Sequence, residues 1–161
     1  MKRLVIAAIA TLFLASPLAA QAESQGMIVK QSAFGVTKTI DRLGIIMQRK
    51  GITIFARVNH GKGAKKVGKD IGEVELLIFG TPKMGTPLMA SNRGIGIDLP
   101  LKALAWKDAD GKVWLGYNDP KHLATRHGIA DRDKVFKKMA GALDKFSHIA
   151  VTKGALKPAA N

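Results

Sequence analysis

Lys83, Thr86 and Pro87 form the part of the sequence with the clearest chemical potential. The pair Thr86-Pro87 is typical of a helix start, and we predict a short helix over 87–91. The free N–H groups and the dipole at such a start favour a carboxylate or a phosphate, and the Lys83 ammonium group would lie beside them. We therefore predict a small anion-binding site, with the ligand-binding residues Lys83, Thr86, His60, Arg126 and Asp98.

The same residues allow other interpretations. Thr86 can simply cap the helix without any ligand. Asp98 can pair with Lys83 or with Arg126 instead of contributing to a site. His60 stands alone at the end of a predicted strand, and it could act as an acid or base because histidine titrates near neutral pH.

No other part of the sequence forms a catalytic or metal-binding constellation. The absence of cysteine excludes disulfides, thiolate metal sites and covalently attached c-type haem. His122 and His127 lie five positions apart and diverge by about 140° on a helix, so they do not suit one metal ion. The segment Gly63–Lys69 matches a phosphate-binding loop, but Asp70 stands where that loop has serine or threonine. We predict no catalytic residue, no metal and no cofactor, and an enzyme is the less favoured interpretation.

The first 22 residues are typical of a cleaved signal peptide. Lys2 and Arg3 precede an apolar run over 4–15, and Ala20-Gln21-Ala22 has the A-x-A form of a cleavage site. The apolar run is too short to span a bilayer, which needs about 20 residues. We expect a periplasmic or secreted protein without a membrane span after cleavage near Ala22.

The mature chain is strongly basic. Without Lys2 and Arg3 it keeps 24 lysine and arginine residues against 12 acidic ones. Such a charge often indicates a nucleic-acid partner, but we expect no nucleic-acid partner for an exported protein. A small anionic ligand or an anionic envelope surface fits better, and simple solubility is the alternative.

Hydrophobic periodicity predicts an α+β domain with helices packed on an antiparallel-rich sheet. Val36, Ile40, Leu43 and Met47 share one face of a predicted helix over 36–50. The predicted strands cover 27–33, 52–58, 74–79, 101–106 and 113–117. Further helices are predicted within 60–69, from Pro120 to Gly128, and after a capping Asp131, with the last stripe at Val135, Met139, Leu143, Phe146 and Ile149. The domain boundaries expected are 1–22 signal peptide, 23–35 polar start and first strand, 36–152 single domain, and 153–161 disordered tail.

One long segment of the sequence resembles the signature motif of a known family. The run from Leu76 to Met89, LLIFGTPKMGTPLM, resembles the domain-of-unknown-function family numbered 302, and so do the later blocks Gly96–Leu101, Trp106–Gly111, Tyr117–Pro120, Leu123 and Arg126–Gly128. The resemblance implies a β-α-β(4)-α order, related to the fold of the TATA-binding protein, and a homodimer. The family often has Asp-His where this chain has Asn59-His60, which weakens any transfer of a catalytic role to His60.

Three functions follow from these observations. The first is an exported small-ligand-binding or interaction module of unknown specificity. The second is an enzyme that uses His60 as acid or base in a small anion-binding pocket. The third is a basic structural or surface-interaction protein, whose charge matters more than any pocket.

Overall fold

The computed structural model describes residues 26–156. The predicted signal peptide and part of the predicted tail lie outside this range. The elements in chain order are β1 (Met27–Ser32), α1 (Val36–Arg49), β2 (Thr53–Asn59), α2 (His60–Lys66), β3 (Val74–Gly80), α3 (Pro82–Ser91), the 3₁₀ helix η1 (Arg93–Ile97), β4 (Leu101–Lys107), β5 (Val113–Asn118), α4 (Pro120–Arg126) and α5 (Asp133–Val151). None of the helices within 26–156 has the length and apolar character needed to cross a membrane.

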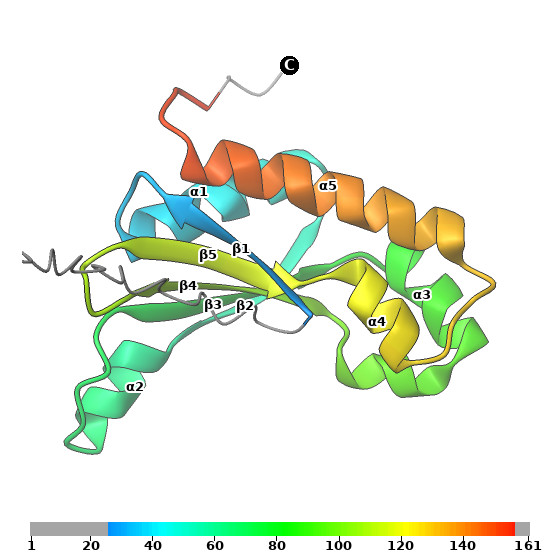
Figure 1. Cartoon of the computed structure of the whole chain (residues 1–161), viewed down its shortest axis with the longest axis horizontal. Coiled ribbons are helices and arrows are strands. Elements are labelled where there is room, and N and C mark those ends of the chain that lie inside the picture. Colours follow the sequence, from blue (N-terminus) through cyan, green and yellow to red (C-terminus); the bar gives the residue numbers. More distant parts are fainter. Residues whose placement is uncertain (1–25, 157–161) are drawn as a thin grey trace, which may run out of the picture.

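The five strands form one antiparallel sheet in the order β1-β5-β4-β3-β2. Helices α1 and α5 contact each other and cover one face of this sheet (Figure 1). The short helices α3 and α4 lie beyond one end of the strands, and α2 extends from the other end (Figure 1). The predicted α+β class and β-α-β(4)-α order are confirmed, with α2, α3, η1 and α4 inserted between these elements.

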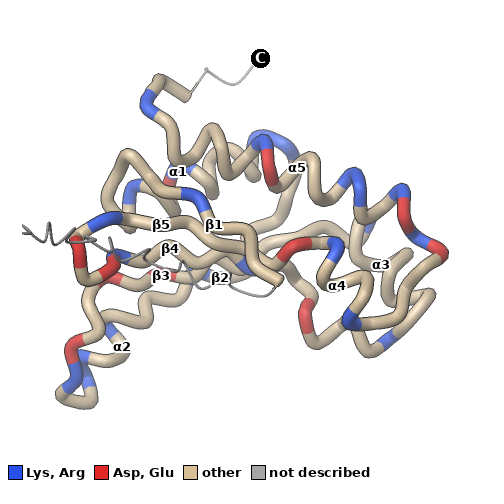
Figure 2. Tube along the Cα trace, in the orientation of Figure 1, with Lys and Arg blue, Asp and Glu red and all other residues tan. Residues whose placement is uncertain are grey.

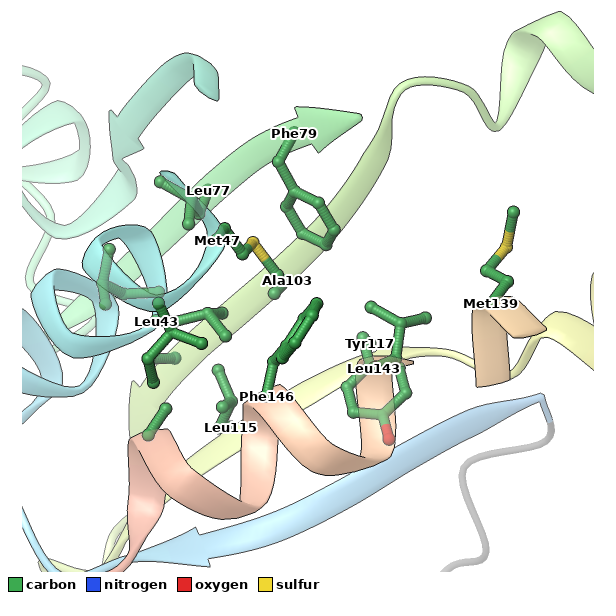
Figure 3. Close-up of a cluster of buried hydrophobic side chains, with 14 of the residues drawn as sticks. Leu43, Met47, Leu77, Phe79, Ala103, Leu115, Tyr117, Met139, Leu143 and Phe146 are labelled. Carbon is green, nitrogen blue, oxygen red and sulfur yellow. The ribbon is translucent and has the colours of Figure 1, made fainter. Parts of the chain in front are cut away.

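The core lies between the sheet and the two long helices. Figure 3 shows Leu43 and Met47 of α1 and Phe146 of α5 meeting Leu77 and Phe79 of β3. The predicted apolar face of α1 is buried, and so are Met139, Leu143 and Phe146 of α5. The helical and strand periodicities therefore predicted the two layers correctly.

The opposite sheet face remains open within residues 26–156 (Figure 1). The outward residues of four strands lie on this open face and are mostly apolar, apart from Lys102: Val58, Leu76, Ile78, Leu104, Trp106 and Trp114 are among them. A Cβ at Gly116 would lie 2.8 Å from the Met27 methyl group and 3.0 Å from the Trp106 ring. Glycine is thus needed where these two side chains pack over β5.

The alternation of Ile52, Ile54, Ala56 and Val58 in the sequence predicts that these side chains share one buried face, and this is wrong for the second half of β2. Ile54 packs against the core as expected, but the register shifts between Ile54 and Ala56. A bulge adds one residue and reverses the alternation, which a sequence period of two does not anticipate. As a result Arg57 and Asn59 face the helix side, while Val58 lies 38% exposed on the open face.

Arg42 joins α1 to the end of α5. Its side chain is only 9% exposed and donates hydrogen bonds to the carbonyl oxygens of Ile149, Ala150, Thr152 and Gly154, at 2.9–3.1 Å. The guanidinium carbon also lies 4.4 Å from the centre of the Phe34 ring. A cation at a helix C-terminus is favourable because it satisfies carbonyls that have no partner within the helix.

The β4–β5 turn is organised by Asp108. Its carboxylate accepts hydrogen bonds from the Trp114 indole at 2.6 Å and from the Lys112 backbone N–H at 2.8 Å. The indole hydrogen bond is the main reason why the pKa of Asp108 lies below its ordinary value of 3.8. The turn thus also holds the Trp114 side chain in place.

We expect tryptophan emission to report the ionisation of Asp108. Because its pKa is lower in the folded state, the carboxylate stabilises the fold above about pH 4, and this contribution disappears as pH falls through the lowered pKa. A fluorescence titration should show a step with a midpoint below 3.8. Asp108→Asn should remove that step, whereas Asp110→Asn, in the same turn, should keep it. A step that persists in Asp108→Asn would assign it to another carboxylate.

Candidate functional site

Two adjoining hollows lie between the end of β3, α3 and α5. Their volumes are about 310 and 370 Å³, and both are lined by Met84 and Met139. We call them together the methionine pocket; its other lining residues are Lys50, Gly51, Ile52, Phe55, Phe79, Gly80, Thr81, Pro82, Lys83, Gly85, Thr86, Met89, Leu99, Pro100, Leu101, Lys138, Ala142, Leu143 and Phe146. Such flexible thioether side chains adapt to apolar ligands of different shapes.

Three lysines stand around the second hollow. Lys50 follows α1, Lys83 lies in the first turn of α3, and Lys138 lies on α5. Each is exposed, and none forms an ion pair with any carboxylate of residues 26–156. The pocket therefore combines an apolar interior with positive charge at its rim, which suits an organic anion.

Helix α3 begins five residues earlier than predicted. Thr81 is its N-cap residue and Pro82 its first helical residue, so Pro87 lies inside the helix. Thr86 therefore does not cap a helix, and the predicted anion site at a helix start before Pro87 is wrong. The sequence offers two Thr-Pro pairs, and the one that directly follows β3 begins the helix. Thr86 still lines the first hollow.

His60 lies far from Lys83 along the sheet. It begins α2 after the end of β2, where Asn59 pairs with Glu75 near the start of β3, whereas Lys83 follows the end of β3. The His60 side chain is exposed, and its predicted position beside Lys83 and Thr86 is wrong. The length of β2 and β3 therefore separates His60 from Lys83 and Thr86, which were predicted to form one site.

Glu75, at the base of α2, is the centre of a buried polar cluster. It is 5% exposed and accepts hydrogen bonds from Thr37 at 2.8 Å, Asn59 at 3.0 Å and Arg57 Nε at 2.7 Å. Burial opposes the charge of Arg57, but hydrogen bonds with Glu75 and Asp41 outweigh it and raise the pKa of Arg57. The Asn59 oxygen also accepts the Lys62 N–H at 2.7 Å. This asparagine therefore holds the start of α2 in place.

Asp98 and Arg126 form a second polar cluster with His127. Asp98 lies 3.5 Å from Arg126 and 2.6 Å from His127 Nε2, and both the Asp98 and His127 side chains are largely buried. Of the two alternative partners offered for Asp98, Lys83 and Arg126, the structure has the pair with Arg126, and Asp98 and Arg126 do not line the methionine pocket. The cluster connects the segment after η1 to the end of α4.

The five predicted site residues thus fall into three places. Lys83 and Thr86 line the methionine pocket, Asp98 and Arg126 form the ion pair, and His60 lies at the opposite end. No local pattern predicts Lys50 and Lys138 as site residues, because they reach the rim from the end of α1 and from α5, which are distant in sequence. The prediction that Met139 lies in the core is correct, but the same side chain also lines the pocket. Across residues 26–156, no three histidine, aspartate or glutamate side chains lie close enough to hold a metal ion.

Comparison with known proteins adds a family to this geometry. The sequence model described as "Domain of unknown function DUF302" matches residues 28–146, most of the sheet and its helices. The chain belongs to the DUF302 family. A crystal structure of an uncharacterised conserved DUF302 protein from Bacillus stearothermophilus is similar, with a TM-score of 0.63 and 18% identity over 80% of this chain and 97% of that one. At this identity the similarity confirms the fold and leaves the function open.

Curated relatives of this DUF302 chain carry another name. A protein of Brucella suis biovar 1 (strain 1330), "Fluoride-specific ion channel FluC 1", is 46% identical over 113 residues, which are 70% of this chain and 44% of that protein. "Fluoride-specific ion channel FluC 2" of Brucella melitensis biotype 1 is 46% identical over 113 residues, 70% of this chain and 42% of its own length. The chain spans less than half the length of these relatives.

Proposed function

We propose that this DUF302 protein is an exported module that binds a small organic anion with an apolar body. The observation that carries the proposal is the methionine pocket, where Lys50 after α1, Lys83 of α3 and Lys138 of α5 converge on an apolar hollow. The apolar body would lie against Met84 and Met139, and the anionic group would face the lysines. Cavities of this size accommodate metabolite-sized ligands.

Binding is favoured over catalysis by the chemistry of the lining. The polar side chains in the methionine pocket are lysines and two threonines, Thr81 and Thr86, with no histidine or carboxylate to activate them. The alternative enzyme would use His60, which lies exposed at the other end of the sheet. Export itself rests on the sequence of residues 1–22, and the mass of the protein isolated from the envelope would reveal cleavage after Ala22.

The names of the Brucella relatives make fluoride a second anion to test. Fluoride is small and strongly hydrated, so moving it into an apolar hollow would be costly. An organic anion, in contrast, gains from burial of its apolar part. The methionine pocket therefore favours the organic anion, and fluoride serves as a comparison ligand.

The expected result is that decanoate binds and that its affinity depends on both parts of the pocket. Isothermal titration calorimetry should show decanoate binding about fivefold more tightly than decanol, because only the carboxylate interacts with the lysines. Ala142→Leu should weaken decanoate binding about tenfold, because Ala142 lines the second hollow and the larger side chain would fill it. Lys83→Gln should weaken it about threefold.

Matched variants separate this effect from general changes. Ala140→Leu is the same substitution two positions away on α5, in a different hollow, and should leave decanoate binding unchanged. Lys134→Gln removes an exposed lysine elsewhere on α5 and should also have no effect. Absence of decanoate binding, or equal loss in the Ala140 and Ala142 variants, would contradict the proposal, as would binding of fluoride alone.

We also propose that two copies associate through the open face. Five strands about 4.8 Å apart, each about six residues long, give a face of about 24 by 20 Å. This area is of the same order as the approximately 800 Å² that each partner buries in a stable complex. Leu104 and Trp106 of β4 lie near its centre, and such an apolar sheet face is normally covered.

Light scattering tests this association directly. The protein should have the mass of two copies, and Leu104→Glu should reduce it to one copy while the melting temperature changes by only a few degrees. Ile45→Glu introduces the same charge at an exposed position of α1 and should leave the dimer intact. A single-copy mass for the unaltered protein would overturn the homodimer.

A further inference from the structure

A basic arm projects from the end of the sheet between β2 and β3. This arm, residues 60–72, consists of α2 and the turn that returns to β3 (Figure 1). Its two ends meet closely, because a Cβ at Gly61 would lie only 2.4 Å from the Gly72 carbonyl oxygen. Asn59 caps α2 and also donates to Glu75 at 3.0 Å. The arm is thus attached to the buried polar cluster at its base.

The positive charge of the arm is not neutralised within the described chain. It carries Lys62, Lys65, Lys66 and Lys69 against a single carboxylate, Asp70. All four lysines are exposed, and none forms an ion pair with a carboxylate of residues 26–156. Figure 2 shows the blue segments gathered at this projecting end. The three lysines of α2 have the spacing that places side chains on one side of a helix.

Apolar side chains are exposed beside these lysines. Val67, in the turn after α2, is 74% exposed, and Ile71, on the returning segment, is 52% exposed. Neither packs in the hydrophobic core. Apolar groups among unpaired lysines are typical of segments that bind the interface of an anionic bilayer, where the apolar groups enter the headgroup region.

We propose that the basic arm docks the protein on the surface of an anionic phospholipid bilayer. Each lysine near such a surface strengthens binding by about fivefold at moderate salt. Four lysines with two small apolar side chains therefore give weak, reversible and salt-sensitive binding. A soluble polyanion would use the lysines alone, whereas Val67 and Ile71 favour a bilayer. The basic arm shares no residue with the methionine pocket, so membrane docking can be tested independently of ligand binding.

Co-sedimentation with vesicles tests the role of the four lysines. The purified protein should bind vesicles that contain phosphatidylglycerol, and it should not bind vesicles of phosphatidylcholine alone. Replacing Lys62, Lys65, Lys66 and Lys69 with glutamine should weaken binding by about 600-fold, about fivefold for each lysine. The matched control replaces four exposed lysines elsewhere with glutamine, at Lys121, Lys134, Lys145 and Lys153. It makes the same change in net charge and should alter binding by less than about threefold.

A fluorescent label tests the entry of Val67 into the bilayer. Because the chain contains no cysteine, Val67→Cys can be labelled at one position with an environment-sensitive dye. Anionic vesicles should shift its emission to the blue, whereas a label at Ile45→Cys on α1 should not respond. The proposal would be overturned by equal losses in the two glutamine variants, by an absence of vesicle binding, or by binding to soluble heparin without a shift on vesicles.

Discussion

Replacing Arg42 with methionine is expected to lower the free energy of unfolding by about 3 kcal/mol. The substitution keeps much of the side-chain volume but removes four hydrogen bonds to carbonyl oxygens at the end of α5. It also removes the positive charge that lies near the end of α5 and over the face of the Phe34 ring. Chemical denaturation monitored by circular dichroism measures the loss.

Two further variants isolate the cause. Arg42→Lys keeps the charge but lacks the planar fork that reaches several carbonyls, so most of the loss should remain. Arg93→Met makes the same change as Arg42→Met at an exposed position of η1 and should cost less than about 0.5 kcal/mol. If Arg42→Met cost no more than Arg93→Met, the join between α1 and α5 would not depend on these hydrogen bonds.

Glu75→Gln is expected to cost about 2–3 kcal/mol, again measured by chemical denaturation. The carboxylate accepts from Thr37 and Asn59 on one oxygen and from Arg57 on the other. A glutamine amide has only one acceptor oxygen, so its NH₂ group must face donors on one side. Arg57 would also lose its most buried counter-charge.

The neighbouring acidic residue supplies the control. Glu73 is 57% exposed and lies 3.7 Å from Lys107, so Glu73→Gln should cost less than about 0.5 kcal/mol. Glu75→Gln should also increase hydrogen exchange in α2, because Asn59 would lose the partner that positions this cap. Equal costs for the two substitutions would show that burial of Glu75 adds nothing to its ion pair.

The family membership establishes the fold, whereas the proposed ligand depends on the pocket. The DUF302 match establishes the fold over residues 28–146, and the crystal structure from Bacillus stearothermophilus agrees with it. Neither assigns a ligand, because one fold supports many functions. The proposed organic anion therefore depends on Lys50, Lys83, Lys138 and the apolar lining, and the calorimetric comparison of decanoate with decanol decides it.

The sequence by itself determined the elements and their buried faces where the hydrophobic period was regular. The stripe Val36, Ile40, Leu43 and Met47 fixed α1, and the apolar run of β3 fixed a central strand. These patterns are local, since a period of 3.6 or 2 is a property of consecutive residues. Asp119-Pro120 likewise gave the start of α4 correctly. Asp131, however, does not cap α5, because the helix begins at Asp133 and Arg132 is its N-cap residue; the Asp131 carboxylate accepts from Ser91 at 2.9 Å instead.

Only the tertiary structure decided which residues meet. The bulge at Ile54/Ala56 reversed the faces of the second half of β2, and this placed Asn59 beside Glu75. The antiparallel pairing of β2 with β3 placed His60 at the far end from Lys83. The choice between two Thr-Pro pairs set the start of α3 and removed the predicted helix cap at Thr86. Lys50 and Lys138 joined Lys83 because α1, α3 and α5 meet at one end of the sheet. Such meetings depend on packing between distant segments, which no local period encodes.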